Sequence, residues 1–461
     1  MMPDQAGPER CDLLIRGGAV MTFDPAIGDI PDGAIAIAGN RIAAVGPSAH
    51  LARRFAAART IDAQGALIRP GFIDAHYHVL LHLSRGVLGK PGGAADAWAQ
   101  GPGAFATWVE MLSEEDEHVS TLLACIEMVR NGYTMFMEPG TALTPEAAAE
   151  AITAVGMRGV LADPYLRDVD EGPSGLPAPR VRGGLGRARA LLGRQLARNS
   201  DRAALVQGHV AIYGAGTCSL ALIREAHECA TAAGAIFAMH QSFAPEDHAF
   251  DRARFGRAPM VHLAEIGLLG PRTTFTHLNV IEEAELRAIA ASGMNIVWHP
   301  GNAMYYGLAQ QAPFRFGQLV KSGVAVALGN DVAKAWSFGD LPLVGYLLAR
   351  EHGDPIAPAD LLRMLTAGGA RAVGRAGELG ALTPGFLADV VVARRDGPEA
   401  QPGVDLALHV ALISRSRAVE HVIVDGTIVV ENGRCTRVDE GAIYERARRC
   451  LAQIAARASA H

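Results

Sequence analysis

The sequence predicts an α/β protein built around a (β/α)8 barrel of the TIM type, inserted into a small β-sandwich that both ends of the chain form. Two observations lead to this prediction. The middle of the chain repeats short apolar runs separated by segments of helical periodicity, as βα units around a parallel sheet do. The two ends carry strand patterns and turn signals instead. With 461 residues, of which 49% are hydrophobic, the chain can bury a large core.

Both ends of the chain have the pattern of strands joined by tight turns. Residues 11–62 alternate short apolar runs with turn signals, and Gly39 and Asn40 tolerate the positive φ angles that a primed hairpin turn needs. The C-terminal part repeats this style, with a hairpin over 422–433 that turns at Asp425. The two patches are therefore expected to join in one small sandwich.

The middle of the chain contains eight candidate strands, at 71–78, 133–138, 158–163, 204–211, 235–240, 273–278, 294–299 and 325–331. Helical candidates lie between and after them, at 114–131, 218–233, 282–292 and 358–372, and Ser113 is the expected N-cap of the first. Eight strands with crossovers favour a closed barrel. A doubly wound open sheet is the structural alternative.

These patterns divide the chain into four expected parts. Residues 1–69 supply the N-terminal part of the small β domain, and residues 70–376 form the (β/α)8 barrel. Residues 377–438 return to the small β domain, and residues 439–461 form a C-terminal helix.

Composition narrows the class of protein. Lys and Arg number 42 against 48 Asp and Glu, a net charge of -6, which argues against nucleic acid or an anionic membrane as a partner. No apolar run is long enough to span a membrane, and the N-terminus lacks the pattern of a secretory signal. The six cysteines are scattered without a CxxC pair, which fits a reducing compartment. We therefore expect a cytoplasmic protein.

Polar residues interrupt these strands at their C-terminal ends. His76 and His78 stand two apart, so the period of a strand places both side chains on one face. The ends of four later strands carry His240, His277, His299 and Asp331. In a barrel these ends converge on the face where active sites are built. Imidazoles with a carboxylate form a site suited to Zn²⁺, with Fe²⁺, Co²⁺ and Mn²⁺ as alternatives.

Several segments resemble the amidohydrolase superfamily of metal-dependent barrel hydrolases, and in particular its deaminase and chlorohydrolase branch. They are RPGFIDAHYHV (69–79), EMVRNGYTMFME (127–138), TCSLALIREAHECA (217–230), WHPGNAMYYG (298–307) and ALGNDVA (327–333), followed by the segments PADLLRMLTAGGARAVG and GELGALTPGFLADVVVA. The resemblance covers roughly residues 11–435, and its HxH and ALGND segments are the specific ones. It implies a barrel enzyme that hydrolyses carbon–nitrogen bonds other than peptide bonds.

Carried over residue by residue, the resemblance implies that His76, His78, His240 and Asp331 bind the metal. Asp331 would also accept a proton from the attacking water, and His277 would be a nearby acid, base or water-orienting group. Binuclear members of the superfamily use a carboxylated lysine on the fourth strand, and ALVQGHVA (204–211) contains none. We therefore expect one divalent ion, with Zn²⁺ as the best fit.

The sequence also departs from the resemblance. Many deaminases of this branch carry a Glu three residues after the fifth-strand His, and here that position is Phe243. A phenyl ring cannot carry a proton to a ring nitrogen, which favours attack on an acyclic carbonyl instead. The expected substrate is then a small apolar amide, urea, carbamate or thiocarbamate, as in the phenylurea and thiocarbamate hydrolases. The alternatives are a deaminase or dechlorinase of a nitrogen heterocycle, in which another group replaces the missing Glu, and an inactive scaffold barrel.

Six residues are candidates for contact with the substrate because they lie at strand ends or on loops at the same face: His209, His299, Glu138, Trp98, Phe243 and Tyr305. For each of them, core packing or a structural hydrogen bond is the competing explanation. The resemblance further implies a homo-oligomer.

Overall fold

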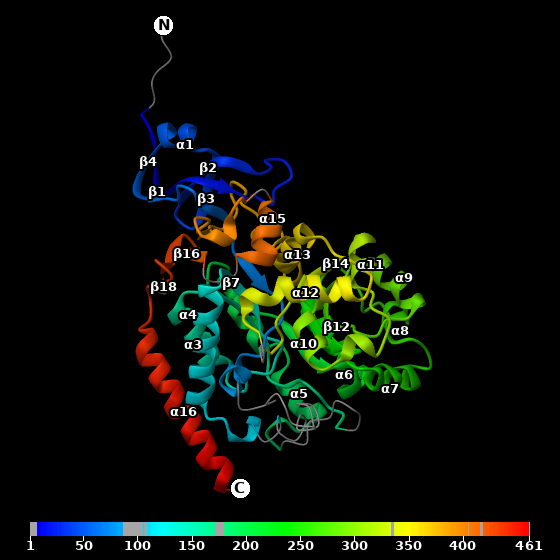
Figure 1. Ribbon diagram of the computed structural model, residues 1–461. Coiled ribbons are helices and arrows are strands. Elements are labelled where there is room, and N and C mark those ends of the chain that lie inside the picture. The colour runs from blue at the N-terminus through cyan, green and yellow to red at the C-terminus, as the bar shows by residue number, and fades with distance from the viewer. Residues whose placement is uncertain are drawn as a thin grey trace.

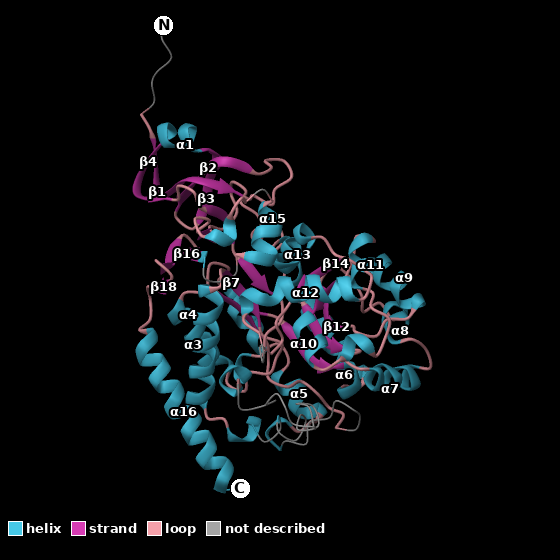
Figure 2. Cartoon of the chain, viewed as in Figure 1, coloured by secondary structure: helices cyan, strands magenta, loops and turns pink. Residues whose placement is uncertain are grey.

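A barrel of parallel strands occupies the middle of the chain, with helices around it (Figures 1 and 2). The computed structural model describes residues 7–85, 105, 108–170, 179–332, 336–403, 405–414 and 418–460. The barrel strands are β6 (Phe72–Asp74), β7 (Tyr133–Met137), β8 (Arg158–Leu161), β9 (Val206–Gly208), β10 (Val210–Gly214), β11 (Phe237–Gln241), β12 (Thr273–His277), β13 (Asn295–Trp298) and β14 (Ala325–Leu328). They follow the eight predicted strands, with the fourth divided into β9 and β10 at His209.

Hydrogen bonds connect these strands into a closed ring. One run is β6-β7-β8-β9 and the other is β10-β11-β12-β13-β14, all parallel. The amide of His209, between β9 and β10, donates to the carbonyl of Leu161. On the other side the amide of Ala75 donates to the carbonyl of Leu328 at 3.0 Å, and Tyr77 pairs with Asp331 in a parallel bridge. This closure confirms the barrel over the open sheet.

The barrel helices are α3 (Glu114–Arg130), α4 (Pro145–Val155), α5 (Leu185–Leu191), α6 (Leu220–Ala232), α7 (Pro245–Phe255), α8 (Pro259–Glu265), α9 (Glu283–Ser292), α10 (Pro300–Tyr305), α11 (Phe316–Lys321), α12 (Leu341–Glu351), α13 (Pro358–Leu365) and α14 (Ala367–Ala372). Ser113 caps α3 as predicted, since its hydroxyl accepts from the amide of Asp116 at 3.2 Å. The helix predicted over 358–372 is instead two helices, α13 and α14. The break lies at Thr366, whose ψ of -97° is not helical.

Both ends of the chain join in a second unit, above the barrel in Figure 1. Its strands are β1 (Glu9–Val20), β2 (Ile30–Ala38), β3 (Arg41–Pro47), β4 (Phe55–Asp62), β5 (Leu67–Pro70), β15 (Val390–Ala393), β16 (Val419–Val424), β17 (Thr427–Glu431) and β18 (Arg434–Cys435), with α1 (Ser48–Arg54) beside β3. All nine strands belong to one mixed sheet, in which β5 pairs with β15 antiparallel. Both predicted hairpins are present, with positive φ at Gly39, Asp425 and Gly426. Both ends of the chain thus contribute to one small β unit, as the sequence predicts.

A buried arginine connects the barrel to this sheet. The guanidinium of Arg158, on β8, is 1% exposed and donates from Nε to both carboxylate oxygens of Asp389 at 3.2 Å. Its Nη2 donates to Asp425 Oδ1 at 2.6 Å. The two acids lie just before β15 and in the turn after β16, so one cation joins the barrel to the C-terminal strands.

The last helix, α16 (Glu440–Ala460), runs beside α3 (Figure 1). Arg446 pairs with Glu115 at 2.9 Å and Arg457 pairs with Asp116, so ionic contacts at two levels hold the helices together. No described helix is both long and apolar enough to cross a membrane. All six cysteines are free thiols in the structure.

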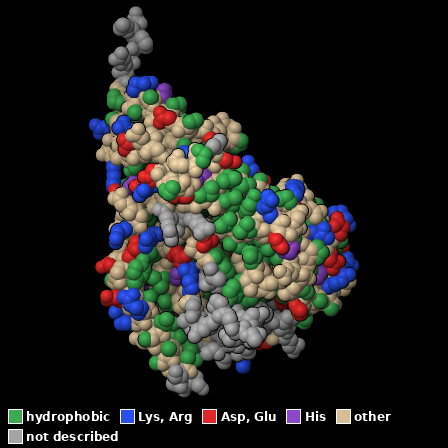
Figure 3. Space-filling model, in the orientation of Figure 1, with side chains coloured by type: hydrophobic (Ala, Val, Ile, Leu, Met, Phe, Trp, Pro, Cys, Tyr) green, Lys and Arg blue, Asp and Glu red, His purple; other side chains and the backbone are tan. Residues whose placement is uncertain are grey.

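Hydrophobic side chains gather on the face that carries α12 and α15 (Leu406–Leu408), as Figure 3 shows. Leu347 on α12 is 53% exposed, and Leu408 on α15 is 39% exposed. Apolar patches of this kind are typical of contact surfaces between proteins. The homo-oligomer remains a prediction.

Candidate metal centre

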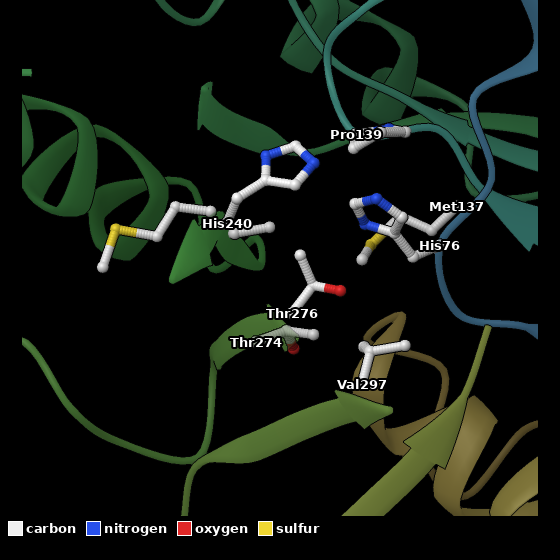
Figure 4. A pocket seen from close by; sticks show the side chains of 9 residues that line it. His76, Met137, Pro139, His240, Thr274, Thr276 and Val297 are labelled. Atoms are coloured by element: carbon white, nitrogen blue, oxygen red, sulfur yellow. The ribbon is translucent and has the colours of Figure 1, made fainter. Parts of the chain in front are cut away.

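Three histidine side chains converge at the C-terminal end of the barrel. His76 and His78 follow β6, and His240 lies in β11. The Nε2 atoms of His76 and His78 are 3.1 Å apart, and those of His78 and His240 are 3.4 Å apart. One ligand atom of each residue lies within 4.8 Å of the other two. Figure 4 shows the rings of His76 and His240 beside each other above Thr274 and Val297, and their planes are perpendicular.

A carboxylate completes this cluster. Asp331 follows β14, and its Oδ1 lies 2.9 Å from His78 Nε2 and 3.5 Å from His76 Nε2. The set of three imidazole nitrogens and one carboxylate oxygen is buried, and its donor atoms crowd around one point. This is the donor chemistry of a site for one divalent ion such as Zn²⁺, so the residues present fit such an ion.

The environment keeps these groups in the protonation state that a ligand needs. Burial lowers the pKa of His240 to about 3 and that of His76 well below its usual range, so both imidazoles are neutral at neutral pH. Burial alone would raise the pKa of Asp331, but the surrounding imidazoles, His76 and His78 foremost, hold it well below its usual range. A cation therefore need not displace a proton from these three groups.

Two ligand rings are oriented by hydrogen bonds at their other nitrogen. His240 Nδ1 donates to the carbonyl of Tyr213 at 2.5 Å, and His78 Nδ1 lies 2.8 Å from Thr141 Oγ1. A ring that carries its proton on Nδ1 presents an unprotonated Nε2. Both contacts therefore favour the tautomer in which the Nε2 that faces the cluster is unprotonated.

His277 lies beside the cluster, at the end of β12. Its ring stacks on that of His240, with centroids 5.4 Å apart, and its φ of +74° is rare for a residue with a side chain. Its Nδ1 is buried and has no hydrogen-bond partner among the described residues. A buried polar atom without a partner at the edge of the cluster marks His277 as a group available to the substrate.

His299 has both ring nitrogens engaged by the protein. Nδ1 lies 2.8 Å from the carbonyl of Gly329, and Nε2 bonds to the hydroxyl of Thr276. No nitrogen is left for the substrate in this arrangement. A small cavity of about 10 Å³, room for one water molecule, lies below the cluster and is lined in part by Thr276 (Figure 4).

Phe243 lies where the resemblance expects an acid. Its ring centroid is 4.7 Å from that of His277 and 6.1 Å from that of Tyr306. Tyr305, the neighbouring candidate, instead lies near Trp336, at 6.3 Å between ring centroids. Phe243 and Tyr306 thus form an aromatic wall beside His277. Trp98 lies outside the described residues.

The carboxylate of Glu138, just after β7, is used within its own loop. It accepts from the backbone amides of Gly140, Thr141 and Ala142 and from the Thr141 hydroxyl. The carbonyl of Glu138 is 2.7 Å from His209 Nε2, which therefore donates to it. His209 Nδ1 is then an acceptor, buried and without a partner in the described part of the chain. Burial lowers the pKa of His209 to about 4, so its ring is neutral.

Sequence reasoning missed three residues that contact the cluster or its strands. Asn302 donates to Asp331 Oδ2, Thr141 contacts His78, and Asp74 accepts from the amides of His76 and Asn330 at 3.1 Å. Asp74 is the last residue of β6, so strand-end polarity could have singled it out. Asn302 lies in α10, inside a segment that carries the resemblance. Thr141 follows Glu138 by three residues, a spacing that carries no signal of its own.

The fourth strand supplies no lysine for a second ion, as expected from the sequence. β9 and β10 contain none, and Lys321 pairs with Asp354 on the outside of the barrel. The other two lysines, Lys90 and Lys334, lie outside the described residues. The described side chains therefore provide for one ion.

Comparisons with known proteins extend over nearly the whole chain. The sequence model of the amidohydrolase family matches residues 67–429. A 5-methylthioadenosine/S-adenosylhomocysteine deaminase of Syntrophobacter fumaroxidans is 34% identical over 451 residues, covering 96% of this chain and 98% of that protein. A 5′-deoxyadenosine deaminase of Methanosarcina mazei is 26% identical, covering 97% and 99%.

Solved structures share the fold. An adenosine deaminase from Xanthomonas campestris with bound zinc superposes with a TM-score of 0.85 at 24% identity, covering 97% of this chain and 100% of that chain. An atrazine chlorohydrolase from Arthrobacter aurescens complexed with zinc has a TM-score of 0.81 at 24% identity, covering 96% and 100%. The superposed regions include both the barrel and the small β unit.

Proposed function

Because this chain belongs to the amidohydrolase family, we propose that it is a zinc-dependent deaminase that releases ammonia from the adenine ring of a nucleoside modified at its 5′ position. The observation that carries the proposal is the buried cluster of three imidazoles and one carboxylate at the barrel mouth. It is supported by the similarity of the chain, over nearly its whole length, to two proteins named as deaminases. The relatives favour ring deamination, the alternative that the sequence left open, over hydrolysis of an acyclic urea or carbamate.

His76, His78, His240 and Asp331 would hold the ion. When bound, a divalent ion lowers the pKa of a water molecule to about 7. The ionised carboxylate of Asp331 accepts the proton of the attacking water and passes it to the departing amine. His277, neutral and with Nδ1 uncommitted, lies beside His240, where it orients the water or the ring carbon under attack. These roles are proposals for this chain.

The aromatic wall beside His277 suits a flat apolar ring. Phe243 and Tyr306 come from the loops after β11 and β13, and their edges exclude water from one side of the site. His209 offers a lone pair at Nδ1, so it accepts from a group that carries a hydrogen, such as an amino group. We propose Phe243, Tyr306 and His209 as substrate contacts, and assign Glu138 and His299 to support of the site.

One observation favours a second candidate, the hydrolysis of a urea, carbamate or thiocarbamate. Ring deamination requires a proton at a ring nitrogen, and Phe243 cannot supply it. Glu246 is exposed, and Asp247 accepts from the amide of Ala244 at the start of α7. The acceptor nitrogen of His209 also matches the N–H of a urea. In the deaminase, a water molecule would have to deliver the ring proton.

Product analysis separates the two candidates. We expect the zinc-loaded protein to release one ammonia per 5′-methylthioadenosine, S-adenosylhomocysteine or 5′-deoxyadenosine, with the ultraviolet change of an adenine ring losing its amino group. Phenylureas and thiocarbamates would remain intact in the same assay, and the Asp331→Asn variant is the inactive control. Turnover confined to ureas or thiocarbamates, with release of an amine or a thiol, would refute the deaminase and support the second candidate.

A further inference from the structure

We propose that Thr141 and Glu138 are positioning residues that fix the proton of His78 on Nδ1, so that Nε2 stays free for the metal ion. The inference rests on the metal site of the proposed function. Its geometry is a relay of three buried groups: Glu138 Oε1 lies 2.5 Å from Thr141 Oγ1, which lies 2.8 Å from His78 Nδ1.

The carboxylate of Glu138 is surrounded by hydrogen-bond donors. Its two oxygens accept hydrogen bonds from the amides of Gly140, Thr141 and Ala142 at 2.8 to 3.1 Å, and the side chain is fully buried. All of these partners are donors, so the loop is arranged around a carboxylate that accepts at both oxygens. Burial raises the pKa of Glu138, and the hydrogen bonds from Thr141 and Gly140 oppose that rise. Glu138 therefore has no hydrogen to give to the Thr141 hydroxyl.

The directions of the Thr141–Glu138 and His78–Thr141 hydrogen bonds follow from the hydrogens that these groups carry. A threonine hydroxyl has one hydrogen, and Thr141 donates it to Glu138 Oε1, over the short distance typical of a charge-assisted bond. The Thr141 oxygen can then only accept from His78, which must carry its proton on Nδ1. In the other tautomer two lone pairs would face each other, and the proton would sit on the nitrogen that faces Asp331 and the other ligands.

The contrast with His240 shows why this relay can be tested by substitution. His240 Nδ1 donates to a backbone carbonyl, that of Tyr213, which no side-chain change removes. Among the described residues, His78 is the ligand of the cluster whose Nδ1 partner is a side chain. Its tautomer therefore depends on the identity of residue 141.

The first test is zinc affinity, measured by competition with a chelator of known affinity. Thr141→Val keeps the shape and removes the hydroxyl, and we expect it to weaken zinc binding about 10- to 100-fold. Thr141→Ser keeps the hydroxyl and should restore affinity close to the native value. Thr121→Val is the matched control, because Thr121 is equally buried but bonds only to the carbonyl of Glu117 in α3. Native affinity in Thr141→Val would overturn the proposal.

The second test reads the tautomer directly in metal-free protein. Nitrogen-15 chemical shifts of histidine-labelled protein distinguish Nδ1–H from Nε2–H, and His78→Gln identifies the signal by its loss. We expect Nδ1–H at His78 in the native protein and its loss in Thr141→Val but not in Thr121→Val. An Nε2–H signal in the native protein would overturn the relay. Failure of the native protein to bind zinc, with the Nδ1–H signal present, would refute the proposed function while supporting the relay.

Discussion

Asp331→Asn is expected to lower kcat by about a hundred- to ten-thousand-fold. Asp331 is the carboxylate that contacts His76 and His78, and its pKa is held well below the usual range, so it is ionised at neutral pH. An amide at this position can neither accept the proton of the attacking water nor contribute negative charge to the ion. The measurement is the rate of product release at saturating substrate and zinc.

Asn is the right replacement because Asp331 has a φ of +57°, a left-handed conformation that Asn tolerates better than other side chains. The variant should therefore fold like the native protein, as circular dichroism and thermal unfolding can verify. Asp396→Asn, on an exposed acid paired with Arg394, controls for loss of one negative charge. If Asp331→Asn kept a rate near that of this control, Asp331 would not be the proton acceptor.

Arg158→Leu is expected to lower the free energy of unfolding by about 3–5 kcal/mol, the cost of breaking a buried ion pair from one side. Asp389 is 4% exposed, and both of its carboxylate oxygens accept hydrogen bonds from Arg158 Nε. Asp425 accepts a hydrogen bond from Arg158 Nη2. Removal of the guanidinium leaves the Asp389 carboxylate buried without its ion-pair partner and removes this contact between the barrel and the C-terminal strands. The measurement is the urea-unfolding midpoint with its slope.

The control for this change is Arg189→Leu. Arg189 pairs with Glu225 at 2.5 Å, but the two side chains are 52% and 31% exposed. Solvent screens such a pair, so its loss should cost about 0–1 kcal/mol. A loss in Arg158→Leu no larger than in this control would show that the buried cation is not what joins the two units.

Much of the fold could be predicted because strand patterns and turn residues act locally. The barrel strands end where polar residues interrupt apolar runs, and the turns at Gly39 and Asp425 need the positive φ that they adopt. The helix predicted over 358–372 divides at Thr366, because the backbone of this residue departs from the helical region. Its hydroxyl donates to the carbonyl of Leu362 in α13. Periodicity does not report such a break.

The convergence of His76, His78, His240 and Asp331 followed from their places at strand ends. The contacts that orient these ligands could not be predicted from the sequence, because they depend on loop geometry. Gly140, with φ of +84°, turns the chain so that Thr141 reaches both Glu138 and His78, and spacing alone cannot show this. His299 has the strand-end position of a site residue, but contacts with Gly329 and Thr276 occupy both its nitrogens.

The most direct test of the metal centre is anomalous X-ray diffraction at the zinc absorption edge, on crystals of zinc-loaded protein. One peak per chain is expected, about 2.0–2.1 Å from Nε2 of His76, His78 and His240 and in contact with Asp331. The His240→Ala variant should lose most of that peak. A peak elsewhere in the chain, or no peak at these side chains at full zinc loading, would contradict a metal centre at the mouth of this barrel.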